Sequence, residues 1–356
     1  MSDDSHEHEH DENCDHDHGD PRLIAGWAAL DEGDVALAKA KAAELLADAD
    51  AEAEVFLFAA AVAREDGDAT TALSHLASAE KSDPSWGVPL LWRAEIQAGQ
   101  GDLKGALKEA SRALDKVEDE EDFLSALALK ASLELELDRP EEAAETLGSL
   151  PPADVALPDP ALATELASLL LEVGDAEGAK TRLEVVVRDE PDAAEAWYLL
   201  GAAADALEEE ELRSKAWLEA RRLDLEADAE SPAKEREGLS DDALEAAAER
   251  VLAELPPELR RRLGDVPVVV AEVPAAEDVQ TGLDPRALGL FEGTPLADQG
   301  SASQGGPTRI VLFRANLARV APDGESAADE VRTTVLHEVG HFLGLDEDAL
   351  DKMGLA

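Results

Sequence analysis

The spacing of turn residues is the feature that most limits how this chain can fold. Six positions in the first two thirds of the sequence share it: Gly33, Gly67, Gly101, Asp138, Gly174 and Glu208. The successive intervals are 34, 34, 37, 36 and 34 residues, and an aspartate follows each of the four glycines. A period of 34 residues is typical of helix-turn-helix units that stack into a solenoid. The pattern therefore predicts an all-helical superhelix of about six repeats.

Small residues keep the same register around these turns. Alanine stands five residues after each of the first five turn positions, and glycine or alanine stands seven residues before all six. Small side chains at fixed positions let paired helices approach closely. Within the last repeat, residues 194–201 read Ala-Glu-Ala-Trp-Tyr-Leu-Leu-Gly. This segment resembles the first helix of a tetratricopeptide repeat (TPR), and the resemblance covers about residues 22–228.

A TPR region implies a function in binding. Stacked repeats bury one continuous core and leave a concave groove, and in this family the groove usually holds an extended or helical peptide. We therefore expect a protein or peptide partner in the groove of residues 21–228. A spacer without a ligand is the alternative.

The charge of the chain limits its partners further. The sequence has 82 acidic and 31 basic residues, a formal net charge of −51. Nucleic acid and anionic membranes would be repelled, so we expect neither as a partner and favour basic peptides or cations. A high-salt habitat would produce the same excess. The sequence also lacks a long apolar run and a positively charged apolar leader, and Cys14 is its only cysteine, so we expect a cytoplasmic protein without an export signal.

The first 20 residues differ from the rest of the chain. They include nine acidic residues, Cys14 and five histidines, which are His6, His8, His10, His16 and His18. Almost nothing in this segment could be buried, so it is predicted to be a disordered tail. Clustered imidazoles could collect metal ions, but the histidines have no fixed ligand spacing. A solvated acidic tail is the alternative.

Composition changes again after the repeats. Residues 229–239 are charged and lack apolar periodicity, which predicts a linker. Residues 240–356 are predicted to form a small α+β domain. Its expected elements are a helix from Ser240 to about Leu255, strands at 266–273 and 309–313, an irregular stretch at 282–307, and a helix capped by Ser326 that runs to about Leu343.

Three residues of this last helix form the motif HExxH: His337, Glu338 and His341. Side chains four residues apart lie on one helix face, so both imidazoles can reach one zinc ion. Zinc lowers the pKa of a bound water to about 7, and Glu338 is predicted to be the general base that accepts its proton. Gly344 is the predicted helix stop. A metal site without useful hydrolysis is the alternative.

The sequence also offers a third zinc ligand. In the longer pattern HExxHxxGxx, the chain turns at the glycine and the next residue after the pattern returns to the metal. That residue is Glu347, where metzincins usually have histidine, and a carboxylate oxygen is an acceptable zinc ligand. Asp346 and Asp348 flank it and could substitute. An acidic surface loop that binds no metal is a further alternative.

The domain resembles a known family in four blocks that follow in order. They are residues 266–270, 288–293, 309–314 and 335–344. These blocks are similar to those of minimal zincin domains, zinc metallopeptidase-like proteins with a matrix-metalloproteinase-like core. The resemblance implies a compact zincin fold with an acidic third ligand position. The domain lacks tyrosine and a third histidine, so zinc itself, Arg314 or Arg319 is expected to stabilise an oxyanion.

Together these features predict a zinc-dependent metallopeptidase with a TPR region. The superhelix would bind a protein or peptide, and the zincin domain would hydrolyse a peptide bond. A TPR scaffold or adaptor with a catalytically weak, structural zinc module is the main alternative. Metal storage or delivery, with the histidine-rich tail feeding the site, is the third.

Overall fold

The structure is a computed structural model. It describes residues 20–48, 51–230, 232–233, 236, 238–264, 266–293, 309–321 and 324–344. The predicted tail therefore lies outside the described residues, apart from Asp20. The chain divides into two compact units, Met1–Leu150 and Pro151–Ala356, so that the repeats extend over the first unit and into the second. The predicted domain boundaries at residues 228 and 240 stay predictions.

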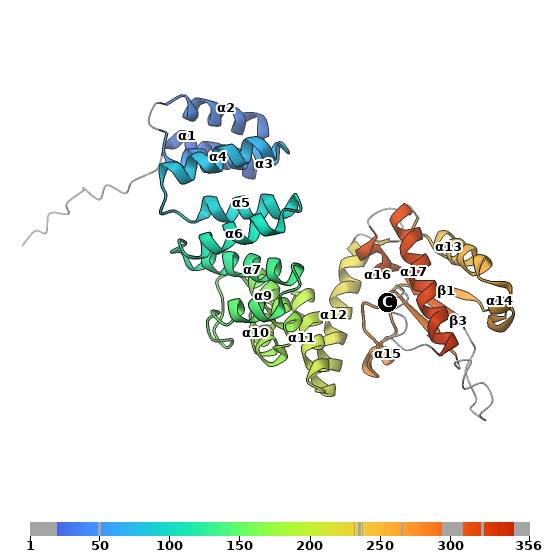
Figure 1. The fold of residues 1–356 in the computed structure, drawn as a ribbon. Coiled ribbons are helices and arrows are strands. Elements are labelled where there is room, and N and C mark those ends of the chain that lie inside the picture. Colours follow the sequence, from blue (N-terminus) through green and yellow to red (C-terminus); the bar gives the residue numbers. More distant parts are fainter. Residues whose placement is uncertain are drawn as a thin grey trace, which may run out of the picture. The chain divides into compact units, whose positions relative to one another are not determined.

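The described part of the first unit consists of four helix pairs (Figure 1). The helices are α1 (Pro21–Asp31), α2 (Val35–Leu46), α3 (Ala53–Glu65), α4 (Ala69–Ser82), α5 (Val88–Gly99), α6 (Leu103–Leu114), α7 (Glu120–Glu136) and α8 (Pro140–Leu147). The second unit begins with two more pairs, which are α9 (Pro160–Glu172), α10 (Ala176–Asp189), α11 (Ala194–Ala206) and α12 (Glu210–Glu230). Six helix pairs therefore follow one another along the sequence, and the predicted all-helical, TPR-like class of this region is confirmed.

The turn within each helix pair adopts a left-handed conformation. Gly33, Gly67, Gly101 and Gly174 have φ of 76°, 74°, 81° and 86°. Glycine is favoured there because it has no Cβ. Asp138 and Glu208 take the same conformation at φ 60° and 59°. The aspartate after each glycine caps the second helix of the pair, as the Asp34 carboxylate does by accepting the Leu37 N–H at 3.0 Å.

Small residues sit where the helices touch. The five alanines after the turns, Ala38, Ala72, Ala106, Ala143 and Ala179, are all fully buried. A Cβ on Gly26 would lie 2.4 Å from Cζ of Phe58, and one on Gly201 would lie 2.0 Å from Cδ1 of Trp217. In both cases the aromatic ring of a neighbouring helix fills the space that the missing side chain leaves. The register of small residues in the sequence predicts such a close approach of helices.

The rest of the second unit contains a small sheet covered by helices (Figure 1). Its elements are α13 (Asp241–Glu254), α14 (Pro257–Leu263), β1 (Val268–Ala271), α15 (Ala276–Gln280), β2 (Gly289–Glu292), β3 (Arg309–Phe313), α16 (Arg314–Val320) and α17 (Gly324–Leu343). The strand order is β1-β3-β2, with β1 parallel and β2 antiparallel to β3. The predicted α+β class is confirmed.

Several element boundaries differ from the sequence-based expectation. Ser240 caps α13 as predicted, by accepting the Ala243 N–H, and β3 coincides with the predicted strand. Strand β2 lies inside the stretch predicted to be irregular, and the short helices α14 and α15 were not predicted. Helix α17 begins at Gly324, two residues before the predicted cap Ser326. Helix ends shift by one or two residues easily, because end turns are held by few hydrogen bonds.

One apolar core holds these elements together. It joins α13, α16, α17 and the sheet through residues such as Leu244, Leu317, Val335 and Ile310, all exposed by 1% or less. The predicted linker contributes to this core, because Leu239 is fully buried. Among the described residues, no helix combines the length and the apolar composition needed to cross a bilayer.

Candidate metal centre

Helix α17 carries both candidate histidine ligands. The Nε2 atoms of His337 and His341 lie 2.9 Å apart, and the two ring planes are inclined by 81°. Both side chains are half-buried. The neighbouring face of the helix is anchored in the core by residues exposed by 3% or less, which are Val331, Val335, Val339 and Phe342. This burial fixes the rotation of α17 and therefore the direction of the two imidazoles.

The two imidazoles fit one zinc ion. Nitrogen ligands lie ~2.0–2.1 Å from zinc, so two of them in a tetrahedral site are about 3.3 Å apart. The observed 2.9 Å between the Nε2 atoms is shorter than this value and is also a hydrogen-bond distance, so one zinc ion between the rings requires them to separate slightly. Among the described residues, no group of three histidine, cysteine, aspartate or glutamate side chains gathers in a way that could hold a metal ion.

The predicted third ligand cannot be placed beside these histidines. Glu347, with its alternatives Asp346 and Asp348, lies outside the described residues. The turn that should redirect the chain is described. Helix α17 ends at Leu343, and Gly344 has φ 81° with its N–H bonded to the His341 carbonyl at 3.0 Å. The predicted helix stop at Gly344 is therefore confirmed.

Glu338 is held by the backbone of the neighbouring strand. Its side chain is buried, with 6% exposed, and Oε2 accepts the Phe291 N–H at 2.6 Å. Directly before β2, the Leu288 carbonyl accepts the Phe313 N–H at 2.9 Å. Residues of an antiparallel strand alternate between facing the partner strand and facing away, so Phe291 presents its N–H on the side away from β3. The carboxylate thus occupies the outer side of β2.

A glycine brings β2 this close to α17. A Cβ on Gly289 would lie 2.6 Å from Cγ2 of Thr334 and 3.5 Å from Cγ of Glu338. Only a residue without a side chain fits that space unless the helix shifts. Two residues further, Phe291 packs edge-on against Phe342, with ring centroids 5.6 Å apart. The sequence reading missed both contacts, although Gly289 and Phe291 lie in one of the blocks that carry the zincin resemblance.

The two arginines considered for oxyanion stabilisation have other partners. Arg314 is buried and forms ion pairs with Asp241 and with Glu272, the latter at 3.0 Å. Arg319 Nη2 lies 2.6 Å from Oδ1 of Asp224. None of these three carboxylate groups belongs to α17. The expectation that one of these guanidinium groups serves the histidine site gains no support from the structure.

The C-terminal segment of the chain matches one family model. Residues 263–355 match the model of a family described as zincin-like metallopeptidase. The match includes α17 and the HExxH motif, and it begins after the last repeat helix has ended. Zincin-like metallopeptidases typically use zinc. No curated protein sequence matches the chain significantly.

Solved structures resemble the chain mainly through their helical repeats. The PilF protein of Pseudomonas aeruginosa is 17% identical, with a TM-score of 0.46, over 57% of this chain and 90% of that one. The C-terminal part of a TPR repeat-containing protein from Cytophaga hutchinsonii is 14% identical, with a TM-score of 0.45, over 74% and 95%. YrrB, described as a TPR protein with an unusual peptide-binding site, is 16% identical, with a TM-score of 0.39, over 56% and 93%.

Proposed function

We propose that this chain is a zinc-dependent metallopeptidase that hydrolyses peptide bonds and binds a protein or peptide through its TPR region. One observation carries the proposal. The Nε2 atoms of His337 and His341 converge at 2.9 Å next to the buried Glu338, within a segment that matches zincin-like metallopeptidases. In an HExxH helix the two imidazoles supply two metal ligands and the carboxylate supplies a general base, and a third ligand completes the site.

In this proposal His337, His341 and Glu347 hold the metal. Zinc, when bound, polarises a carbonyl group and makes water more acidic. The histidines are held in place because Val331, Val335, Val339 and Phe342 anchor α17 in the core. Glu347 follows the left-handed Gly344, where a sharp change of chain direction is possible.

Glu338 acts as the general base in the proposed reaction. Its carboxylate accepts a proton from the attacking water, whose oxygen forms a bond to the carbonyl carbon of the substrate. The bond between that carbon and the amide nitrogen then breaks, and Glu338 returns the proton to the leaving nitrogen. The Phe291 N–H holds Oε2 in one direction throughout, so the carboxylate is positioned before the substrate arrives.

The TPR region supplies the proposed partner binding. Stacked helix pairs form a concave surface that usually binds peptides. The net charge of −51 favours segments rich in lysine and arginine, because acidic surfaces attract basic ones over distances of several ångströms. A cytoplasmic location, suggested by the single cysteine, completes the proposal.

Glu338→Gln tests the proposal directly. Glutamine has nearly the shape of glutamate and can still accept the Phe291 N–H, but it cannot take a proton at neutral pH. The variant should keep its fold and its zinc while peptide hydrolysis falls ~100-fold or more, as loss of a general base does. Glu330→Gln is the matched control, because it makes the same chemical change two turns earlier on α17.

The scaffold alternative predicts a different result. A TPR adaptor with a structural zinc module would bind zinc and partner peptides without cleaving them. Among the described residues only two candidate ligands come together, which is the observation that keeps this alternative open. If the zinc-loaded wild-type protein cleaves nothing in a diverse peptide library, the adaptor function replaces the peptidase.

A further inference from the structure

The last helix pair, α11 and α12, contacts the turn that leads into β2. We call residues 284–287 the approach turn, since β2 begins at Gly289. The Tyr198 hydroxyl donates to Oδ2 of Asp284 at 3.0 Å. Burial and the nearby Asp284 carboxylate raise the pKa of Tyr198, so the hydroxyl keeps the proton that it donates. The Arg286 guanidinium lies over the Tyr198 ring, 4.3 Å from its centroid.

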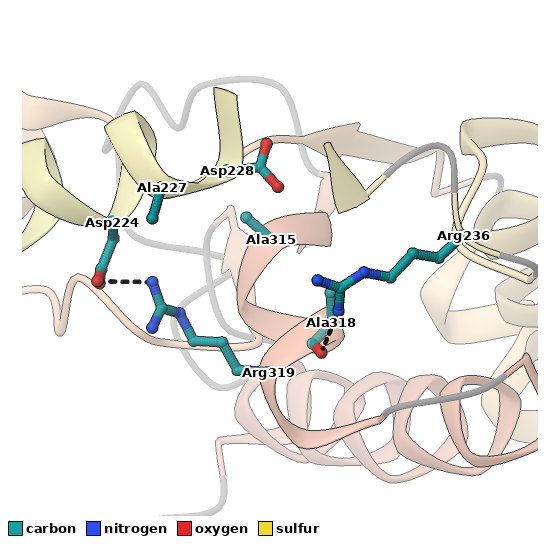
Figure 2. A pocket seen from close by; sticks show the side chains of 7 residues that line it. All are labelled: Asp224, Ala227, Asp228, Arg236, Ala315, Ala318 and Arg319. Atoms are coloured by element: carbon teal, nitrogen blue, oxygen red, sulfur yellow. Dashed lines mark hydrogen bonds and ion pairs between the residues drawn. The ribbon is translucent and has the colours of Figure 1, made fainter. Parts of the chain in front are cut away.

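A buried carboxylate of α12 fixes the same turn. The Asp224 side chain is only 4% exposed, and it accepts Arg286 Nε at 3.1 Å and Arg286 Nη2 at 3.4 Å. Arg286 Nη1 also donates to Glu195 of α11 at 2.5 Å. Arg319 of α16 forms the third contact to Asp224, at the edge of a cavity of about 340 Å³ (Figure 2). A buried carboxylate needs such partners, because an unpaired buried charge is costly.

The opposite side of the approach turn is held by α16. The Asn316 side chain is 1% exposed, and its Nδ2 donates to the carbonyls of Pro285 and Ala287 at 2.9 and 2.7 Å. Directly after the turn, the Leu288 carbonyl accepts the Phe313 N–H and pairing with β3 begins. The approach turn is thus fixed on both sides, and β2 continues from it without an intervening loop.

This arrangement connects the repeats to the proposed general base. Phe291, whose N–H holds Glu338, follows Arg286 by five positions in the sequence. We propose that Arg286 is a positioning residue: paired with Asp224 and Glu195 of the last repeat, it holds β2 where the Phe291 N–H orients Glu338. The role of Glu338 rests on the proposed function, whereas the coupling between Arg286 and Phe291 does not. The last repeat is then part of the hydrolytic machinery as well as part of the solenoid.

Hydrogen exchange in the full-length chain tests the coupling without any substrate. In Arg286→Ala, the Phe291 amide should exchange at least ~10-fold faster, because β2 loses its anchor and opens locally. Amides that pair β1 with β3 should keep their rates. Arg286→Lys should restore part of the protection, since lysine keeps the charge but cannot form the forked contact to Asp224. Arg222→Ala is the control, an exposed arginine of α12 whose ion-pair partners among the described residues are Glu219 and Glu226.

Zinc content and kinetics of the same proteins complete the test. The histidines lie on α17, so Arg286→Ala should retain zinc while kcat falls ~10-fold or more, since a displacement of ~1 Å in a catalytic group has effects of this size. Unchanged exchange at Phe291, or equally faster exchange throughout the sheet, would overturn the proposal. If the wild type hydrolyses nothing, the proposed function fails and the exchange result still decides the coupling.

Discussion

The helical repeats and the zincin-like domain are stabilised by contacts of different range. In the repeats, the left-handed turn recurs in all six helix pairs, and a capping aspartate follows it in four of them. In a solenoid each repeat generally contacts only its neighbours in sequence. In the domain, each contact occurs once, and β1 pairs with β3 across about forty residues of sequence. A repeat protein can lose one such contact and be perturbed locally. The domain has no second copy of the contacts that hold its site.

The largest expected effect is the loss of zinc from the domain. A chain without residues 1–19 should bind about one zinc ion, and His337→Ala should bind almost none at micromolar zinc. The shortened chain keeps Asp20, whose carboxylate caps α1, and it removes the tail histidines that would bind metal by themselves. Metal analysis after dialysis measures the result. Undiminished zinc in His337→Ala would end the assignment of the site.

A pair of glycine substitutions separates local from domain-wide damage. Gly26→Ala would press against Phe58 in the repeats, and Gly289→Ala would press against Thr334 in the domain. Each should cost ~1–3 kcal/mol of stability, the usual range for overpacking. Gly289→Ala should also weaken zinc binding, since its methyl group presses on Thr334 and displaces α17, the helix that carries both histidines, whereas Gly26→Ala should leave zinc binding unchanged. Denaturation curves and zinc titrations would show both effects, and weaker zinc binding in Gly26→Ala would break the comparison.

The third zinc ligand gives a smaller and more specific effect. Glu347→Ala should weaken zinc binding by about 1.4 kcal/mol or more, a tenfold change in affinity. Asp346→Ala and Asp348→Ala should matter much less, because the spacing after Gly344 favours residue 347. Competition with a zinc chelator compares the three variants. If Asp346→Ala or Asp348→Ala is the damaging change, the third ligand is misassigned.

The smallest effect concerns a repeat that departs from the others. Glu208 takes φ 59° where four of the repeats have glycine. Glu208→Gly should stabilise the protein by ~0.5 kcal/mol, because the relief of strain exceeds the extra flexibility that glycine brings to the unfolded chain. Asp138→Gly should act in the same direction. Thermal unfolding measures both, and a destabilised Glu208→Gly protein would contradict the steric argument.

The repeats were predictable because their signals are local and repeated. The glycines, the capping aspartates and the buried alanines each mark the same position many times, so the irregular turns at Asp138 and Glu208 could still be aligned. Helix α17 was predictable for a similar reason, since its buried stripe, its histidines and Gly344 all follow one helical period. Two of the three predicted zinc ligands come together in the structure, and the third lies outside the described residues.

The remaining parts of the site have no local signature. Strand β2 has four residues and includes a glycine, so its apolar pattern is too short to predict a strand. The hydrogen bond from Phe291 to Glu338 comes from a backbone N–H, which every residue except proline has. Arg286 and Asp224 are 62 residues apart, and nothing near either one points to the other. Such contacts depend on the packed fold.

The Asp224 contacts also set an order for folding while the chain is being synthesised. Ribosomes add roughly 5–20 residues per second, so Arg286 follows Asp224 by roughly 3–12 s, and Arg319 comes later still. During that interval the last repeat has its complete sequence but lacks the cations that neutralise its buried carboxylate. The earlier repeats need no such delayed partner. The last helix pair is therefore expected to mature only after the domain behind it has been translated.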